Sequence, residues 1–189
     1  MRSDRPQRGA LLSVEPDALA GQKTPLTRIN YTVIDNVGMP HVIDYIAQKL
    51  SDFDTGALDW VKLLPLNKTT LLHGECTFPG ETQTRGTNYG YRIRASVNVV
   101  MAPPFSYEHW GRIPSTKHAQ GWYSGAQMFY FGDLEECAIH TLSHECFHFL
   151  SDSGQVNLKN TEANANWWGD QWLESYRAIV ERGGQLRLF

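Results

Sequence analysis

Apolar and polar positions in the first half of the chain alternate in a way that predicts strands around one helix. Side chains alternate along positions 26–35, 71–78 and 89–101, and this period of two is typical of half-buried strands. Apolar residues in 39–53 instead recur at spacings of three and four, which indicates a helix, and Pro40 is tolerated in its first turn. The pattern therefore predicts a strand, a helix and two further strands.

The next segment, positions 102–125, lacks a regular period and predicts a long loop. Loops of this length in compact domains are often functional. Its aromatic side chains would either form a wall or lid of a site or pin the loop onto the core. The short run 126–131 predicts a strand directly before the next helix. The loop contains Tyr107, His109, Trp110, His118, Trp122 and Tyr123, and its histidines receive no role from spacing alone.

The strongest helical pattern runs from position 134 to position 150. This segment contains no Gly or Pro, and its apolar residues recur every four positions. Asp133 precedes it and Glu136 follows three residues later, an arrangement typical of a capping box. Asp152 and Gly154 supply a stop signal after it. The recurring apolar residues are Leu134, Ala138, Leu142, Cys146 and Leu150.

Within this helix, residues 144–148 read H-E-x-x-H. Residues four apart lie on one face of a helix, so His144 and His148 can hold one metal ion. Glu145 beside them is suited to act as a general base in metal-assisted hydrolysis. About one chain in a hundred of this composition would contain the pattern by chance. An ordinary buried helix, whose histidines bond only to backbone or carboxylate groups, is the competing interpretation, and the caps and spacing favour the metal site.

A zinc site of this kind needs a third protein ligand. No histidine follows His148, so the candidates are downstream carboxylates. Asp152 lies where the helix ends and would cap it or bond locally. Glu162 is preferred, because Asn160 or Thr161 can cap a second helix there and Glu162 heads its apolar stripe. A carboxylate that interacts only with the helix dipole is the alternative. The stripe consists of Ala165, Trp168, Trp172, Tyr176 and Ile179.

The start of that second helix carries a family resemblance. Residues 162–166 read E-x-x-A-N and continue into W-W-G-D-Q-W-L. This segment resembles the second signature of the ImmA/IrrE-type metallopeptidases and is more distantly similar to the E-x-x-x-D helix of the HtpX-type gluzincins. Together with H-E-x-x-H, the resemblance covers positions 133–173.

The resemblance implies an α+β fold: a zincin-like single domain in which a small mixed sheet packs on the HExxH helix and on a C-terminal helix that bears a ligand. It further implies that His144, His148 and Glu162 bind zinc, that Glu145 is the catalytic base, and that Asn166 bonds the outer atom of a ligand. Three protein ligands leave a fourth zinc position for water.

The implied function is that of a zinc metallopeptidase acting on a restricted protein substrate, such as a regulatory or DNA-bound protein. In such folds an edge strand lines the cleft, and a sheet edge can bind an extended peptide through backbone hydrogen bonds. We expect 126–131 to be that edge. Substrate-binding residues are not assigned, and spacing does not choose among Tyr123, Tyr130 and Tyr176 as the oxyanion-stabilising group.

The alternative function is a structural or assembly protein, within a phage or another multi-protein complex, that keeps the zincin fold with little or no turnover. The intact Glu145 argues against this alternative, because a purely structural zinc ion would not need it.

The length and the net charge of the chain add little to the predicted fold and function. The 189 residues, 41% of them hydrophobic, predict a polar arm over positions 1–24 followed by one metallopeptidase domain over 25–189. The formal net charge of −3 gives no bulk electrostatic case for nucleic acid. Arg2, Arg5 and Arg8 form one basic cluster, so nucleic-acid binding is expected only through this arm.

Partner and location follow from what the sequence lacks. No signal peptide or apolar anchor is recognisable, so we expect no membrane association. Cys76, Cys137 and Cys146 match no paired-cysteine metal spacing, and they predict reduced thiols in a cytoplasmic protein. The expected partner is a protein or peptide substrate, and the sequence does not indicate an oligomeric state.

Overall fold

The computed structural model describes residues 29–67, 70–80 and 89–182. The predicted arm over 1–24, with its basic cluster, lies outside the described residues, as does the start of the first predicted strand. The described residues form six strands and three helices. These elements are β1 (Thr32–Asp35), α1 (Pro40–Leu50), β2 (Leu58–Pro65), β3 (Leu72–Thr77), β4 (Tyr91–Val97), β5 (Phe105–Pro114), β6 (Trp122–Phe131), α2 (Leu134–Asp152) and α3 (Glu162–Glu181).

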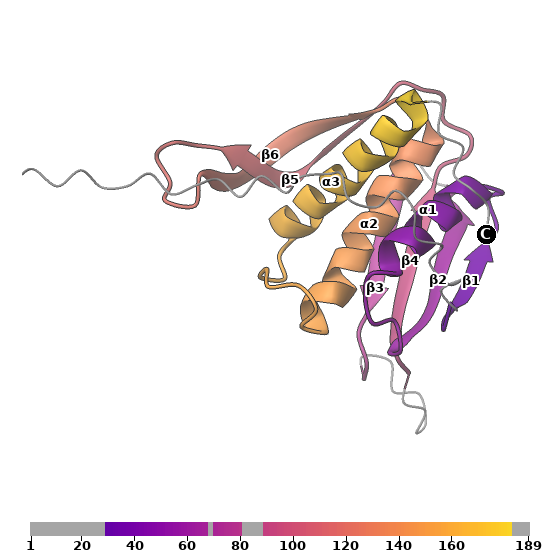
Figure 1. The fold of residues 1–189 in the computed structure, drawn as a ribbon. Helices are drawn as coiled ribbons and strands as arrows, with labels where there is room; N and C mark the ends of the chain where they lie inside the picture. The colour runs from indigo at the N-terminus through magenta and orange to yellow at the C-terminus, as the bar shows by residue number, and fades with distance from the viewer. Residues whose placement is uncertain (1–28, 68–69, 81–88, 183–189) are drawn as a thin grey trace, which may run out of the picture.

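A mixed sheet of four strands in the order β1-β2-β4-β3 forms one layer of the molecule. Strands β1, β2 and β4 are parallel, whereas β3 runs antiparallel to β4 and forms an edge. Helix α2 packs on β3 and β4, α1 lies beside α2, and α3 packs against α2 (Figure 1). The predicted α+β architecture, a mixed sheet with two packed helices, is confirmed.

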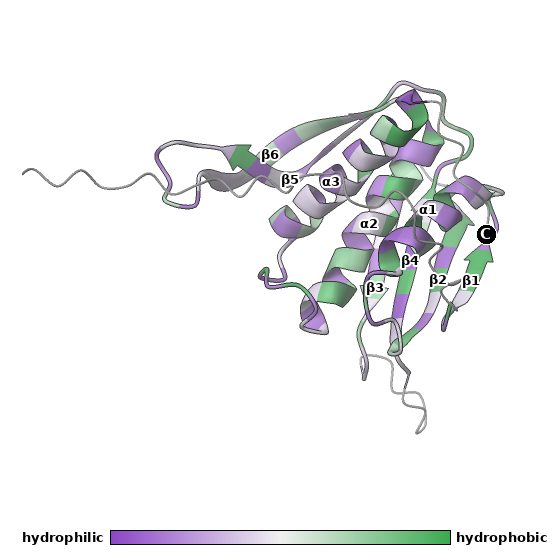
Figure 2. Ribbon diagram, in the orientation of Figure 1, coloured by the Kyte–Doolittle hydropathy of each residue, from purple (hydrophilic) through white to green (hydrophobic). Residues whose placement is uncertain are grey.

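Burial follows the predicted patterns closely. Hydrophobic and hydrophilic residues alternate along most of β4 (Figure 2), and the apolar positions of this strand are buried. Helix α2 is buried on most sides because the sheet covers one side and α3 another. Of the apolar residues predicted to recur every four positions along α2, four are fully buried: Ala138, Leu142, Cys146 and Leu150.

The ends of the two long helices are fixed by side-chain caps. Asp133 accepts a hydrogen bond from the Glu136 backbone N–H at 2.8 Å, and Glu136 accepts one from the Gly132 N–H at 2.8 Å. At the start of α3, the Thr161 side chain accepts from the Asn164 N–H. Both helix starts therefore lie where the sequence predicted them.

The prediction of a long loop over 102–125 is wrong. This segment contains β5 and the first part of β6, which pair as an antiparallel hairpin in a second sheet. The hairpin extends from the main body of the domain (Figure 1). Its alternation is hard to see in the sequence because much of it is exposed, so charged residues and glycine replace apolar ones.

Two further corrections follow from the sheet order. The predicted strand 126–131 is only the second half of β6, and it is not an edge of the main sheet, since β6 pairs with β5. The edge strand beside α2 is β3. Strand β2 was not predicted at all, because Asp59 and Lys62 interrupt its short apolar run.

Candidate metal centre

Helices α2 and α3 bring His144, His148 and Glu162 together into one group of potential metal ligands. The two Nε2 atoms lie 3.1 Å apart. Glu162 Oε2 is 3.2 Å from Nε2 of His144, and Glu162 Oε1 is 3.5 Å from Nε2 of His148. Donor atoms bound to a tetrahedral zinc ion at about 2.0–2.2 Å lie about 3.3–3.6 Å apart. The observed separations lie within about 0.2 Å of this range, so small side-chain shifts would bring the three residues to the geometry of a tetrahedral site.

Two asparagines fix the orientation of the histidine rings. Asn166 Oδ1 lies 2.6 Å from Nδ1 of His144, and Asn160 Oδ1 lies 2.6 Å from Nδ1 of His148. The Asn166 amide also donates to the Trp110 carbonyl at 2.7 Å, which leaves its oxygen to accept the His144 N–H. Each neutral imidazole then carries its proton on Nδ1, and Nε2 keeps the lone pair that a metal ion needs.

Glu162 reaches this group from a more exposed position than its sequence pattern suggested. Its side chain is 66% exposed, so the expectation that it begins the buried stripe is wrong. Of the stripe itself, Ala165, Trp172 and Tyr176 are buried, and Trp168 and Ile179 are partly buried. Glu162 lies in the first turn of α3, where the helix has just left the solvated turn before Thr161. A hydrogen bond with His144 lowers the pKa of Glu162, so its carboxylate is charged at neutral pH.

Glu145 lies beside the ligand group but faces the sheet. Its carboxylate is 3.8 Å from Nε2 of His144, and the residue is 6% exposed. Edge strand β3 passes so closely that a Cβ at Gly74 would collide with this carboxylate. Burial raises the pKa of Glu145 to about 7, opposed by the charge of His144 and by a hydrogen bond from the Cys76 backbone. Near neutral pH the group can therefore both accept and release a proton.

The two histidines differ in their electrostatic surroundings. Burial disfavours the charged form of His144, but its hydrogen bond with Glu162 and the charges of Glu145 and Glu162 outweigh this effect and raise its pKa. The pKa of His148 is lowered, mainly by burial. A cation bound here would take the place of the proton that His144 shares with these carboxylates.

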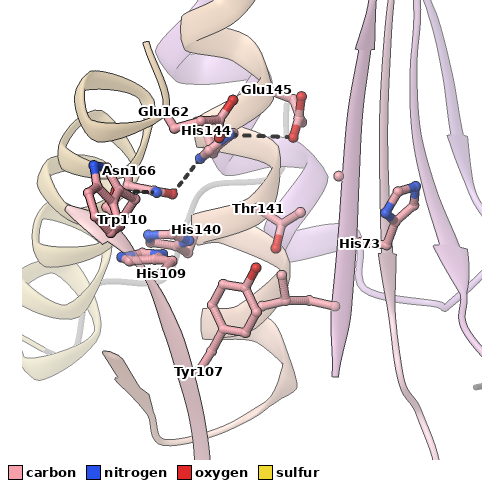
Figure 3. Close-up of a pocket in the computed structure, with 12 residues that line it drawn as sticks. His73, Tyr107, His109, Trp110, His140, Thr141, His144, Glu145, Glu162 and Asn166 are labelled. Carbon is pink, nitrogen blue, oxygen red and sulfur yellow. Dashed lines mark hydrogen bonds and ion pairs between the residues drawn. The ribbon is translucent and has the colours of Figure 1, made fainter. Parts of the chain in front are cut away.

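A cavity of about 320 Å³ opens over this group. Its walls come from the edge strand β3, the β5 strand of the hairpin, α2 and α3 (Figure 3). Tyr107, His109 and Trp110 form the hairpin wall, which sequence analysis had placed in a loop. Polar side chains from β5, α2 and α3 thus converge on one half-open space that β3 closes on its fourth side, as is typical of small-molecule and peptide sites.

The structure separates several other candidates from this centre. Asp152 accepts a hydrogen bond from the Tyr91 hydroxyl at 2.7 Å and is not in the ligand group. None of the three tyrosines considered for oxyanion stabilisation lines the cavity, and its tyrosine is Tyr107. Asn160 was missed as a partner of His148 and was considered only as a helix cap. Its position two residues before Glu162 was the feature of the sequence that could have indicated a place beside the metal ligands.

No helix within the described ranges is long and apolar enough to cross a membrane. Comparison of the chain with protein-family models, with curated proteins and with solved structures finds no match.

Proposed function

We propose that this protein is a zinc-dependent metallopeptidase with a zincin-like fold, in which His144, His148 and Glu162 hold the metal ion. The observation that carries this proposal is the combination of donor atoms from three residues, 3.1–3.5 Å apart, with a second acidic residue, Glu145, held outside the group. A purely structural site has no use for a buried carboxylate beside its ligands. Glu145 occupies that place and lines the same cavity.

The proposed chemistry divides between the ion and Glu145. When bound, zinc would supply a Lewis acid that polarises the scissile carbonyl and makes water acidic near neutral pH. Glu145 would accept the proton of the attacking water and pass it to the leaving amine. A pKa of about 7 suits a group that must do both, and a neighbouring cation would favour its charged, proton-accepting form.

Edge strand β3 is the proposed docking element for an extended peptide. Within the described residues it pairs with no strand other than β4, and we propose that the peptide pairs with the backbone of Leu72–Gly74, the part of this edge beside the cavity. Leu72, His73 and Gly74 line the cavity beside Glu145. A peptide added along this edge would place a backbone carbonyl near the metal group. The hairpin wall opposite restricts access, in keeping with a selected protein substrate such as a regulatory protein.

Replacing Glu145 by glutamine tests the proposal. The amide keeps the size of the carboxylate but cannot accept the proton, so cleavage of a fluorogenic peptide library should fall by about 100-fold or more while zinc content stays the same. Glu108→Gln, an exposed hairpin carboxylate, is the matched control and should leave both quantities unchanged. Equal cleavage by Glu145→Gln and the parent would contradict the assignment of the base.

An assembly role without turnover is the second candidate function. The exposed apolar side chains of the hairpin favour it, since Trp110, Met128 and Tyr130 are 55%, 46% and 69% exposed. Zinc binding by the parent protein without cleavage of any peptide in the library would support this role and contradict the peptidase.

A further inference from the structure

A second cluster of potential ligands lies one helical turn from the first. His109 comes from β5, His140 from α2 and Asp170 from α3, and one donor atom from each lies within 4.8 Å of the other two. Nε2 of His140 is 3.2 Å from Oδ1 of Asp170. The rings of His109 and His140 stack with centroids 5.2 Å apart beside Asn166 (Figure 3). Three separate elements therefore direct metal-ligating groups to one point.

The two histidines of this cluster are buried, and three of their ring nitrogens lack a hydrogen-bond partner. His109 is 8% exposed and His140 is 2% exposed. Both ring nitrogens of His109 and Nε2 of His140 make no hydrogen bond within the described part of the chain, although Asp170 is near. A buried polar group without a partner costs about 1–3 kcal/mol. Unpartnered nitrogens on both histidines indicate a ligand that the described protein atoms do not provide.

The helices repeat the arrangement of the first group one turn further along. His140 precedes His144 by four residues on α2, and Asp170 follows Asn166 by four residues on α3. The backbone of Asn166 also acts on the His140 imidazole and favours its charged form, so α3 contacts this ring beside Asp170. A Cβ at Gly169 would lie 3.0 Å from His140 Nε2, so glycine leaves this nitrogen room.

The charge state of the cluster also suits a cation. Burial lowers the pKa of His109 and of His140 to about 3, so both imidazoles are neutral at physiological pH. Burial and the charge of Glu174 raise the pKa of Asp170 to about 7. The cluster therefore offers two neutral imidazole donors and a carboxyl group from which a bound cation would displace the proton.

We infer that His109, His140 and Asp170 form a second metal site, beside the first, for zinc or another first-row divalent ion that accepts imidazole and carboxylate ligands. The ion would join β5 to both helices and so fix the hairpin wall of the cavity. His109 and His140 line that cavity, so the ion would be held at its wall. This inference does not depend on peptide hydrolysis, because it concerns a separate set of residues.

Metal stoichiometry tests the second site. The purified protein and its variants are saturated with Zn²⁺, desalted and assayed for bound metal, and Co²⁺ binding is followed in parallel by visible absorption. The parent chain should bind two equivalents. His109→Phe and Asp170→Asn should each bind one, His148→Ala should bind one, and His109→Phe combined with His148→Ala should bind none. His118→Phe, on the same hairpin but outside both clusters, should retain two equivalents.

The outcomes separate this site from the proposed peptidase centre. One equivalent in the parent, retained in His109→Phe and Asp170→Asn but lost in His148→Ala, would overturn the second site. One equivalent retained in His148→Ala but lost in Asp170→Asn would support the second site and contradict the first. Near-ultraviolet circular dichroism establishes which variants fold. Asp170→Asn, which is nearly isosteric, gives the decisive count if His109→Phe fails to fold.

Discussion

At the scale of single residues, the hydrogen bonds behind the metal ligands are as specific as the ligands themselves. Asn166 holds both the His144 ring and the Trp110 carbonyl, so one side chain joins α3, α2 and the hairpin. Asn166→Ala should therefore weaken zinc affinity by about 10–100-fold while the protein remains folded. Asn166→Asp, which keeps an acceptor for His144, should retain most of the affinity.

Zinc competition with a chelating dye measures this effect, and the melting temperature reports on folding. Asn157→Ala, at an exposed position in the turn before α3, is the matched control and should behave like the parent. Unchanged affinity in Asn166→Ala would mean that the E-x-x-A-N segment is only a packing pattern.

A second prediction concerns Gly74, where the edge strand passes Glu145. A methyl group here would meet the Glu145 carboxylate, which is the movable partner because it ends a flexible side chain. Gly74→Ala should displace the proposed base by about 1 Å and lower turnover by about 100-fold, with zinc content unchanged. Gly132→Ala, where a Cβ would have ordinary contacts, should keep normal turnover. Rates of peptide cleavage and zinc content, measured for both variants, test this prediction.

The sequence predicts which potential ligands converge when they lie close together in the chain, but not when they lie far apart. His144 and His148 share one helix, so their spacing alone predicts that they converge. Positions 109, 140 and 170 are brought together by packing of the hairpin and two helices, which no local pattern reveals. Glu162 was predicted as a ligand partly because it was expected to be buried, and it is exposed. Its position at the start of a helix, downstream of H-E-x-x-H, was the better indication of its place beside the histidines.

At the scale of elements, an ion pair ties the start of α2 to the end of α3. Arg177 donates to both oxygens of Glu136, at 2.8 and 2.5 Å, and also to the Tyr130 carbonyl at 3.1 Å. The same Glu136 carboxylate accepts the Gly132 N–H. One partly buried carboxylate thus caps the start of α2 and links it to the last turns of α3.

Glu136→Gln should lower the free energy of unfolding by about 1–3 kcal/mol at pH 7. The hydrogen bonds from Arg177 depress the pKa of Glu136 in the folded protein, so their stabilisation is present above the unfolded pKa, about 4.3, and is lost as the pH falls through the folded value. The gap between parent and variant should therefore close below about pH 4. Urea unfolding over a pH series measures it.

Glu174→Gln is the control for this prediction, because Glu174 contacts the same arginine at 2.6 Å but is 65% exposed. Its loss should cost at most about 1 kcal/mol. A pH-independent difference between Glu136→Gln and the parent would show that the effect comes from packing and not from charge.

Element boundaries were predictable where one face is buried and the ends are capped. Helix α2 begins at the expected residue, and β3 and β4 lie within their predicted ranges. The exposed hairpin was missed for the opposite reason. Only a few residues of β5, such as Phe105 and His109, are buried, and its exposed positions mix polar and aromatic side chains, so the sequence shows no clear alternation.

At the scale of the whole molecule, Arg112 holds the hairpin to α3. Its guanidinium lies between the rings of Trp122 and Trp167, at 4.4 and 4.3 Å from their centroids. It also donates twice to Asn164 Oδ1, at 2.9 and 2.7 Å. Asn164 is two residues from Glu162, so this contact places the hairpin relative to the metal group.

Arg112→Lys should lower the free energy of unfolding by about 1–2 kcal/mol, because an ammonium group cannot stack between two rings or donate in a fork. Limited proteolysis should cut the hairpin faster than in the parent. Lys117→Arg, at an exposed site near the hairpin tip, is the charge-conserving control and should be neutral. Unchanged melting and proteolysis in Arg112→Lys would show that other contacts hold the hairpin.

The base of the hairpin has a consequence for how this chain can vary. Phe105 and Phe131 are paired neighbours, both almost fully buried, so the backbone leaves and re-enters the domain at a single point. Residues can then be added or removed at the tip, in matched numbers on both strands, without shifting the helix that follows. Length variation there would alter which molecules reach the cavity while the ligand geometry stays constant. The hairpin tip is thus the place where related chains could diverge most at the least structural cost.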